Sequence, residues 1–381
     1  MDDQSHFADG LTDDITNELA SWRLFPVIAR TSTFTFKGHD LDAAQIGQKL
    51  GARYIVRGSY ERTESRLRVA AQLIDATTGR QLASDRFDQP VDDVFEVRDQ
   101  IAGMVAGSIA PELLKAERER ISRRRSRNPT SYEYFLRGME AHYRYTQHDN
   151  REAQQWLRKA IEADPRNAQA HALLASAMLH AVQHGWRNDA EHNYEVADSL
   201  ATRAVSLDPR APLAHFSLAS TSMFLGRIEN AYAEMTEAIR INPSHAAAHA
   251  LLANLLCFLG RPDEALRSVQ VALRLSPYDP RLGLWLPTMA QARYFLTEYE
   301  ESAAAGRRGL GLIPENILAL RFTAASLGQL GRAGECGALL AALRRSTAPT
   351  LEAIGRSVQH LYRSAAMIEH MLHGLRKAGL D

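Results

Sequence analysis

The chain has 381 residues, of which 45% are hydrophobic and 24% are charged, and its 45 basic residues balance 45 acidic ones. The length predicts two or three domains, or one domain and a repeat array, and the composition predicts a folded protein. The zero net charge excludes a general polyanion binder. Two cysteines are too few for a disulfide framework or a multi-cysteine zinc site, and no apolar run reaches the 18 residues of a transmembrane helix.

The sequence of residues 1–118 predicts a small α+β domain. A helix capped by Thr12 is indicated by LTDDITNELASW, and it is followed by a short strand, FPVIAR, and by a second helix, LDAAQIGQKLG, that ends at a glycine. Three segments of alternating polarity predict a meander of strands with turns at 61–64 and 76–79: ARYIVRGSY, SRLRVAAQLID and RQLASDRFD. A last segment, which begins VDDVFEVRDQ, predicts an amphipathic helix that becomes charged towards its end.

An arginine-rich hinge is expected at 119–129, where ERISRRRSR carries five arginines and one acidic residue. Short basic runs without interleaved aromatic residues are usually solvated linkers, so we favour a linker over a nucleic-acid or lipid patch. Residues 1–118 have a net charge of −5 (14 basic, 19 acidic), and residues 119–127 have a net charge of +4. We therefore expect Arg123, Arg124 and Arg125 to dock on the acidic domain and fix the angle between the two halves.

A repeat of about 34 residues organises the chain over 130–348. Seven prolines recur at intervals of 34 to 44 residues, with alanines five and twelve residues before most of them. Glycines in LGR triplets mark the middle of three repeats, and Thr297 replaces this glycine in the repeat at 280–316. Each repeat predicts two antiparallel helices that a glycine turn joins and a proline ends. The pattern resembles the tetratricopeptide repeat, so we expect an all-α solenoid of about six repeats and a chain that is mainly α overall.

A second resemblance lies in two N-terminal segments, FADGLTDDITNELASWRLFPVIARTSTFTFKG and IGQKLGARYIVRGSYERTESRLRVAAQLIDATTGRQLASDRFD. They are similar to the TolB-like domain that precedes tetratricopeptide repeats in bacterial class III adenylate cyclases and winged-helix transcriptional regulators. The C-terminal MIEHMLHGLRKAGL resembles the closing helix of the same proteins, which implies a capping helix at 349–381.

The chain departs from that family in two ways. The TolB-like domain normally opens with an apolar strand, whereas six residues precede Phe7 here. Either the natural start lies upstream or the domain borrows a strand from a partner, because an unpaired sheet edge is usually avoided. The cyclase or DNA-binding module that supplies output in the family is absent from the 381 residues, so the resemblance transfers no cyclase activity.

We predict no catalytic residue, cofactor or metal site. The sequence has no GxxxxGK[ST], GxSxG or HExxH motif, and its acidic residues do not predict a two-metal site. Each of His171, His215 and His249 lies six residues after a proline, which favours packed imidazoles of the repeat over metal ligands that lack co-ligands. His180 and His184, spaced i and i+4, would need a third ligand to hold a metal.

The concave face of the solenoid is the expected functional surface, because the first helices of stacked pairs line a groove suited to a helix or an extended peptide. From their positions within the repeats, nine residues are predicted to line this partner-binding groove: Ser176, His180, Phe216, Ser220, Met223, Phe224, Asn254, Cys257 and Phe258. Apart from Asn254, it lacks the lysine, asparagine and arginine residues with which chaperone-type repeats clamp a terminal carboxylate, so we expect an apolar or mixed partner segment. Alternatively, Phe216, Phe224 and Phe258 pack between adjacent repeats.

These features predict a non-catalytic protein–protein interaction and regulatory module that binds a protein or peptide segment in the groove. Two alternatives remain open: the C-terminal regulatory half of an adenylate cyclase signalling protein, and the sensor half of a winged-helix regulator, each separated from the output domain that would be its partner. We expect no direct nucleic-acid binding and no membrane contact. The acidic start MDDQSHFADG lacks the layout of a signal peptide, so we expect a soluble cytoplasmic chain, or a periplasmic one if it is part of a longer membrane-anchored protein.

Overall fold

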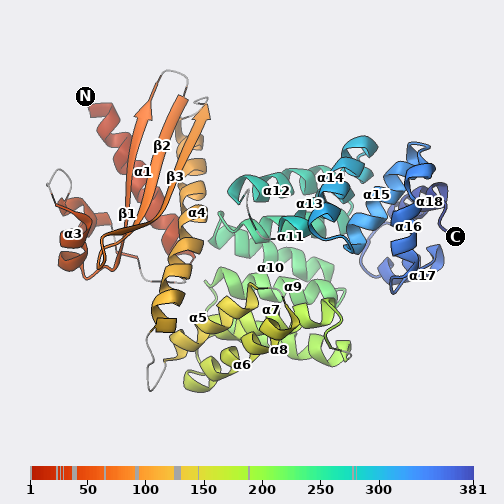
Figure 1. The fold of residues 1–381 in the computed structure, drawn as a ribbon, viewed down its shortest axis with the longest axis horizontal. Coiled ribbons are helices and arrows are strands. Elements are labelled where there is room, and N and C mark those ends of the chain that lie inside the picture. The colour runs from red at the N-terminus through yellow and green to blue at the C-terminus, as the bar shows by residue number, and fades with distance from the viewer. Residues whose placement is uncertain are drawn as a thin grey trace. The chain divides into compact units, whose positions relative to one another are not determined.

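The computed structural model of the chain is divided into two compact units. The described residues are 2–22, 25, 27–28, 30–36, 41–63, 66–90, 94–123, 130–144, 146–187, 189–276, 279 and 281–381. The first unit comprises residues 1–217 and 238–244, and the second comprises residues 218–237 and 245–381. Most of the described residues are helical and the described strands form one small antiparallel sheet, so the predicted fold class is confirmed (Figure 1). No helix within the described ranges is both long enough and apolar enough to span a membrane.

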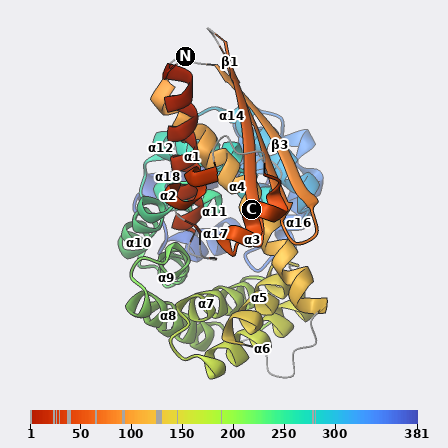
Figure 2. The same ribbon diagram turned by 90° about the vertical axis from the view of Figure 1, so that its left-hand side faces the viewer.

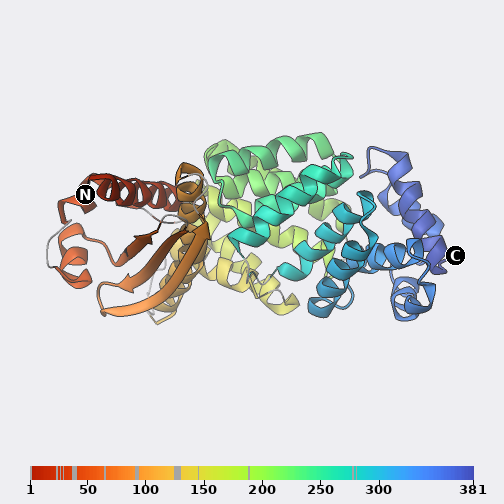
Figure 3. The ribbon, with the colours of Figure 1, turned by 90° about the horizontal axis from the view of Figure 1, so that it is seen from above.

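The first unit begins with a three-stranded sheet and two helices that cover one of its faces. The strands are β1 (Tyr54–Arg62), β2 (Arg66–Asp75) and β3 (Arg80–Pro90), paired antiparallel in the order β1-β2-β3. Alternate residues of β2 are buried in the core: Leu67, Val69, Ala71 and Leu73. The core also holds side chains of α1 (Asp2–Ser21) and α4 (Val94–Arg123), which lie on the same side of the sheet in Figure 2. The strands lie side by side in Figure 3 and follow the predicted meander.

The predicted start and cap of the first helix are wrong. Helix α1 begins at Asp2, and Thr12 lies inside it, where its hydroxyl donates to the carbonyl oxygen of Ala8 at 2.8 Å. The hydroxyl of a threonine in the middle of a helix can donate to the carbonyl oxygen four residues earlier, so a threonine does not have to mark the start of a helix. The FADGL segment therefore belongs to α1, which carries Leu11 and Leu19 into the sheet core.

The strand predicted for FPVIAR is also wrong. Phe25 lies in a bend, and Val27 and Ile28 belong to no strand. Pro26 has no amide hydrogen to donate to a neighbouring strand, which weakens any ladder that includes it. Phe25 and Val27 still pack against the sheet core. Two short helices follow: α2 (Arg30–Thr33) and η1 (Phe34–Phe36).

Two further helices of the small domain were predicted. Helix α3 (Ala43–Leu50) starts with a capping box and stops at Gly51, whose φ is 64°, as the glycine stop predicts. Helix α4 continues past residue 118 and ends at Arg123. Arg124 and Arg125 lie outside the described residues, so the docking of the hinge arginines stays a prediction.

Helix pairs follow along the chain. Those of the first unit are α5 (Ser131–His142) with α6 (Gln147–Ala163), and α7 (Ala168–Gln183) with α8 (Ala190–Leu207). The boundary between the units crosses α9 (Pro212–Phe224) and α10 (Ile228–Ile241). The second unit continues with α11 (Ala246–Phe258), α12 (Pro262–Leu275), α13 (Leu282–Phe295), α14 (Tyr299–Leu312), α15 (Ile317–Gln329), η2 (Ala333–Glu335), α16 (Gly337–Arg344), α17 (Leu351–Val358) and α18 (Ala365–Ala378).

The small residues that recur with the repeat are buried or form the turns. The alanines five residues before the prolines are fully buried: Ala160, Ala204, Ala238 and Ala272. The LGR glycines all have a left-handed backbone: Gly226, Gly260 and Gly331, with φ of 72°, 78° and 73°. The spacing of small residues relative to the repeated prolines therefore predicts both the closely packed positions and the turns of the array.

Thr297 forms the same turn without a glycine, and its φ of 63° is the one left-handed value among the non-glycine residues that the structure describes. A left-handed conformation costs an L-residue about 1–2 kcal/mol. We therefore expect Thr297→Gly to raise the free energy of unfolding by about 1 kcal/mol in urea denaturation. The reciprocal control, Gly260→Ala, should lower it, and a neutral Thr297→Gly would contradict the strain.

Candidate partner-binding groove

Three positions of each repeat define the groove by their distance from the turn: six, three and two residues before the turn residue. On α9 and α11 these positions hold residues that the sequence predicted: Ser220, Met223, Phe224, Asn254, Cys257 and Phe258. The same count from Thr297 and Gly331 gives six further residues on α13 and α15: Gln291, Tyr294, Phe295, Ala325, Gly328 and Gln329. The sequence prediction stopped at α11, and the same count extends the candidate groove to α13 and α15.

C-terminal residues of the same chain lie on these positions in the second unit. Tyr362, in the connection between α17 and α18, packs edge-to-face on Phe258, with ring centroids 5.0 Å apart. Its hydroxyl accepts a hydrogen bond of 2.6 Å from Nε2 of Gln291, and the amide of Arg363 donates to the carbonyl oxygen of Phe258 at 2.9 Å. Tyr362 is 7% exposed, and this burial raises its pKa above the usual value. Phe258 and Gln291 therefore face another part of the chain.

A cluster of rings holds α18 on α13. Tyr294 is fully buried, its hydroxyl donates to the carbonyl oxygen of His370 at 2.7 Å, and the two ring centroids are 4.6 Å apart. The hydroxyl of Tyr299 lies 3.0 Å from Nε2 of His370. Phe295 and Phe322 complete the cluster, with ring centroids 5.7 Å and 5.4 Å from that of Tyr294.

Glycines allow α18 to lie directly against α15, its neighbour in Figure 1. A Cβ atom on Gly328 would overlap the carbonyl oxygen of Gly374, and one on Gly374 would lie 2.8 Å from the carbonyl oxygen of Ala325. Lys377 also donates to the side-chain oxygen of Gln329 at 3.1 Å. The two helix backbones thus touch where two side chains would otherwise separate them.

Groove positions on α11, α13 and α15 therefore contact residues 360–378, which we call the C-terminal segment. The region expected to hold one capping helix, 349–381, forms two helices, α17 and α18. The predicted groove residues of the second unit are buried (Ser220, Met223, Cys257 and Phe258) or half-buried (Phe224 and Asn254). Burial also raises the pKa of the Cys257 thiol, so this cysteine is a packed and unreactive side chain.

Three predicted groove residues belong to the first unit. Ser176 is buried, and its hydroxyl oxygen lies 3.0 Å from that of Ser217. His180 is half-buried and stacks on His142, with ring centroids 4.8 Å apart. Phe216 is half-buried. The nine predicted residues are thus divided between the two units.

Two of the three repeated histidines, His171 and His215, have a structural role. Nε2 of His171 and of His215 lies 3.1 Å and 2.9 Å, respectively, from the carbonyl oxygen of the proline six residues earlier. These contacts tie each helix to the turn before it and explain the six-residue spacing. The described part of the chain holds no group of three metal-ligating side chains, so His180 and His184 gain no third ligand there.

The stability contributed by His370 is expected to depend on pH. Burial lowers its pKa below 6.5, and His373 lowers it further, while the hydroxyl of Tyr299 faces its ring. Because the pKa is lower in the folded chain than in the unfolded one, this stability is present above pH 6.5 and is lost as the pH falls below it. Between about pH 7 and about pH 5.5, His370→Gln should therefore lose less unfolding free energy than the parent. Equal losses in urea titrations would contradict this assignment.

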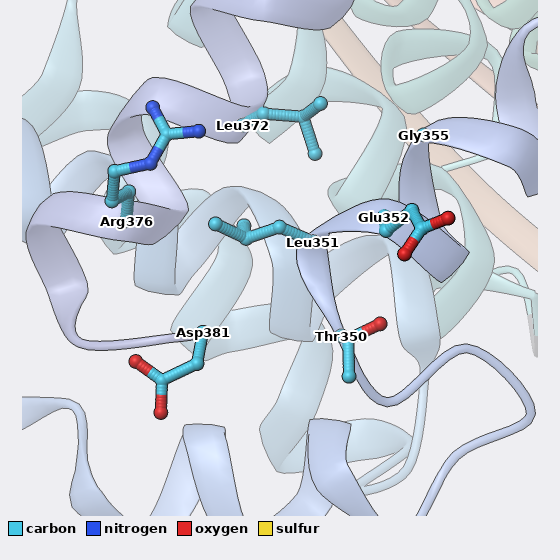
Figure 4. Close-up of a pocket in the computed structure, with 7 residues that line it drawn as sticks. All are labelled: Thr350, Leu351, Glu352, Gly355, Leu372, Arg376 and Asp381. Atoms are coloured by element: carbon cyan, nitrogen blue, oxygen red, sulfur yellow. The ribbon is translucent and has the colours of Figure 1, made fainter.

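An open pocket of about 500 Å³ lies between the start of α17 and the end of α18 (Figure 4). Its lining residues are Thr350, Leu351, Glu352, Gly355, Leu372, Arg376 and Asp381. Two of these residues are hydrogen-bonded to each other, since the amide of Leu351 donates to the carbonyl oxygen of Asp381 at 3.0 Å. One arginine and two carboxylates around apolar side chains do not select a ligand, so the groove remains the candidate site.

Comparisons with known proteins agree with the repeat assignment. Residues 225–284 match the tetratricopeptide repeat family. Over 229 residues, the chain is 31% identical to a protein named putative adenylate cyclase 3 from Rhizobium meliloti (strain 1021). This match covers 60% of the chain but only 39% of that relative's length.

The chain is also similar to solved structures. TTC0263, a thermophilic TPR protein from Thermus thermophilus, is 20% identical with a TM-score of 0.40, and the match covers 52% of this chain and 99% of that one. The APC/C heterotetramer Cut9–Hcn1 is 16% identical with a TM-score of 0.47, covering 76% of this chain and 49% of that one. The helix pairs and the family match together identify a tetratricopeptide-type solenoid, which a small antiparallel sheet precedes.

Proposed function

We propose that this chain is a non-catalytic protein–protein interaction and regulatory module that binds a segment of a partner protein in the groove of its repeats. One observation carries the proposal: the groove positions of α11, α13 and α15 hold a helix and its connection through ring contacts, hydrogen bonds and glycine contacts. Grooves of helical solenoids commonly bind helices or extended peptides. A surface that accommodates α18 has the chemistry to accommodate a helix from another protein.

Photo-crosslinking from the groove tests the proposal. A photoreactive phenylalanine analogue in place of Phe224, which is half-buried on α9, should form an adduct with a partner protein. Mass spectrometry of the crosslinked peptide then identifies that partner. The control has the same photoreactive group at Leu312, which is 57% exposed on α14. Helix α14 is the second helix of its repeat and carries none of the candidate groove positions. An adduct specific to position 224 supports the proposal. Equal adducts at both positions, or none at 224, would contradict it.

The second candidate function is the regulatory half of an adenylate cyclase signalling protein. The 31% identity over 229 residues with putative adenylate cyclase 3 favours it, and the output domain of such a protein would supply the partner segment. The purified chain should form no cyclic AMP from ATP. Measurable formation would overturn the non-catalytic assignment.

The domain organisation belongs to the same proposal. Residues 1–118 would form a TolB-like domain, and the hinge at 119–129 would transmit binding in the repeat array at 130–348 to it. The net charges of −5 for residues 1–118 and +4 for 119–127 support docking of the hinge on this domain.

A further inference from the structure

We infer that the C-terminal segment is an internal ligand of the groove, and that an amphipathic helix of similar chemistry from a partner protein displaces it. This inference rests on the proposed function, because it names the kind of partner and the regulation of the same groove. Three features of the molecule support it: the place of α18, its contact face and its attachment to the array.

The place of α18 differs from that of a helix that extends the array. In stacked repeats, the next helix packs on the preceding pair and continues the stack, which leaves the concave face open to ligands. Helix α18 packs instead on α15 at the groove positions of Ala325 and Gly328, and the connection before it reaches Phe258 on α11. The segment therefore crosses three repeats on the surface that ligands use.

The part of α18 that contacts α13 and α15 includes a stripe of one ring and two small residues, and Met371 and Leu375 of the same helix are also buried. His370, Gly374 and Ala378 are spaced four residues apart and lie on one side of the helix. His370 meets Tyr294, and a Cβ atom on Gly328 would lie 2.7 Å from the amide nitrogen of Ala378. The candidate groove thus fits a ring followed, at intervals of four residues, by two small residues.

The segment, with α17 before it, is joined to the array at one end. Residues 345–350 join α16 to α17 without helix or strand, and Thr347 is exposed. Helices α16 and α17 have eight residues each, so the segment is joined to the array by short elements. A tethered segment has an effective concentration on the order of 1 mM, so a partner has to compete with it.

The expected partner is therefore a helix with a histidine or aromatic ring four residues before a glycine and eight residues before an alanine. A larger side chain at the glycine position is excluded, since it would meet the backbone of Ala325 and the hydroxyl of Tyr294. Such a partner would open the groove only where its affinity exceeds that of the internal segment, which makes binding selective.

Exchange of the segment tests the inference. A protease site inserted at Thr347 allows the folded full chain to be cut once, and a fluorescent peptide of residues 350–381 is then added. The cut chain should exchange its segment for the peptide, and the uncut chain should bind the peptide about 100-fold more weakly because its own segment is tethered. A cut chain that takes up no peptide, or that loses its helical circular dichroism when the segment leaves, would overturn the inference.

A variant of the uncut chain provides a second measurement. Gly374→Leu changes only the segment, and the new side chain cannot fit against Ala325, so peptide affinity should approach that of the cut chain. The matched control is Gly311→Leu on α14, whose Cβ would have no neighbouring atom within 4 Å, and it should bind like the parent. A folded Gly374→Leu chain that binds no peptide would also overturn the inference. The peptide probe is the chain's own segment, so this exchange does not depend on a partner protein. If the segment exchanges but no partner is crosslinked at position 224, only the proposed function is contradicted.

Discussion

Replacing Tyr294 by alanine is expected to lower the free energy of unfolding by about 3–5 kcal/mol, as removal of a large buried aromatic side chain does. Tyr294 is fully buried on α13, and four rings pack around it: Phe295, Tyr299, Phe322 and His370. Its hydroxyl donates to the carbonyl oxygen of His370 and accepts a hydrogen bond of 3.2 Å from Nε2 of Gln329. The alanine variant would leave a cavity under α18, so amides of that helix should exchange hydrogen faster than those of α11.

Tyr294→Phe is the matched control, because it keeps the ring and removes only the hydroxyl. It should cost about 1–2 kcal/mol, since two hydrogen-bonding groups lose their partner while the packing stays. Urea denaturation followed by far-ultraviolet circular dichroism measures both variants. Equal losses for alanine and phenylalanine would show that hydrogen bonding, and not the ring cluster, holds the C-terminal segment.

The repeat region could be predicted because its signals are local and periodic. Ala160 and Ala272 stand at the same distance from a proline and are both fully buried, since closely packed helices need small residues at fixed places. The turns follow the same phase, and Thr297 keeps the left-handed conformation where the glycine is missing. A count from these turns also extends the candidate groove to α13 and α15.

The occupied groove could not be predicted from such signals. Gln291 and Tyr362 are 71 residues apart, and a hydrogen bond between them leaves no periodicity in the sequence. The closing helix has the same amphipathic pattern whichever surface it packs on. The first helix could not be predicted fully for a similar reason. Helix α1 extends to Asp2 and places Leu11 and Leu19 in the sheet core. Such tertiary packing overrides the local cap signal at Thr12.

Gly328→Ala is expected to lower the free energy of unfolding by about 1–3 kcal/mol, although alanine favours a helix over glycine by about 1 kcal/mol. The added Cβ would overlap the carbonyl oxygen of Gly374 and lie 2.7 Å from the amide nitrogen of Ala378. Both are backbone atoms of α18, so neither can rotate away as a side chain would. The whole helix has to move off α15 to make room.

Gly311→Ala on α14 is the matched control, because no neighbouring atom would lie within 4 Å of its Cβ. It should raise the free energy of unfolding by about 0.5–1 kcal/mol through helix propensity and a less flexible unfolded chain. The two glycine replacements are therefore expected to have opposite signs in the same urea titration. If both were stabilising, α18 would not lie against α15 in solution, and a partner could enter the groove without displacing it. The sign for Gly328→Ala thus separates an occupied groove from an open one before any partner is known.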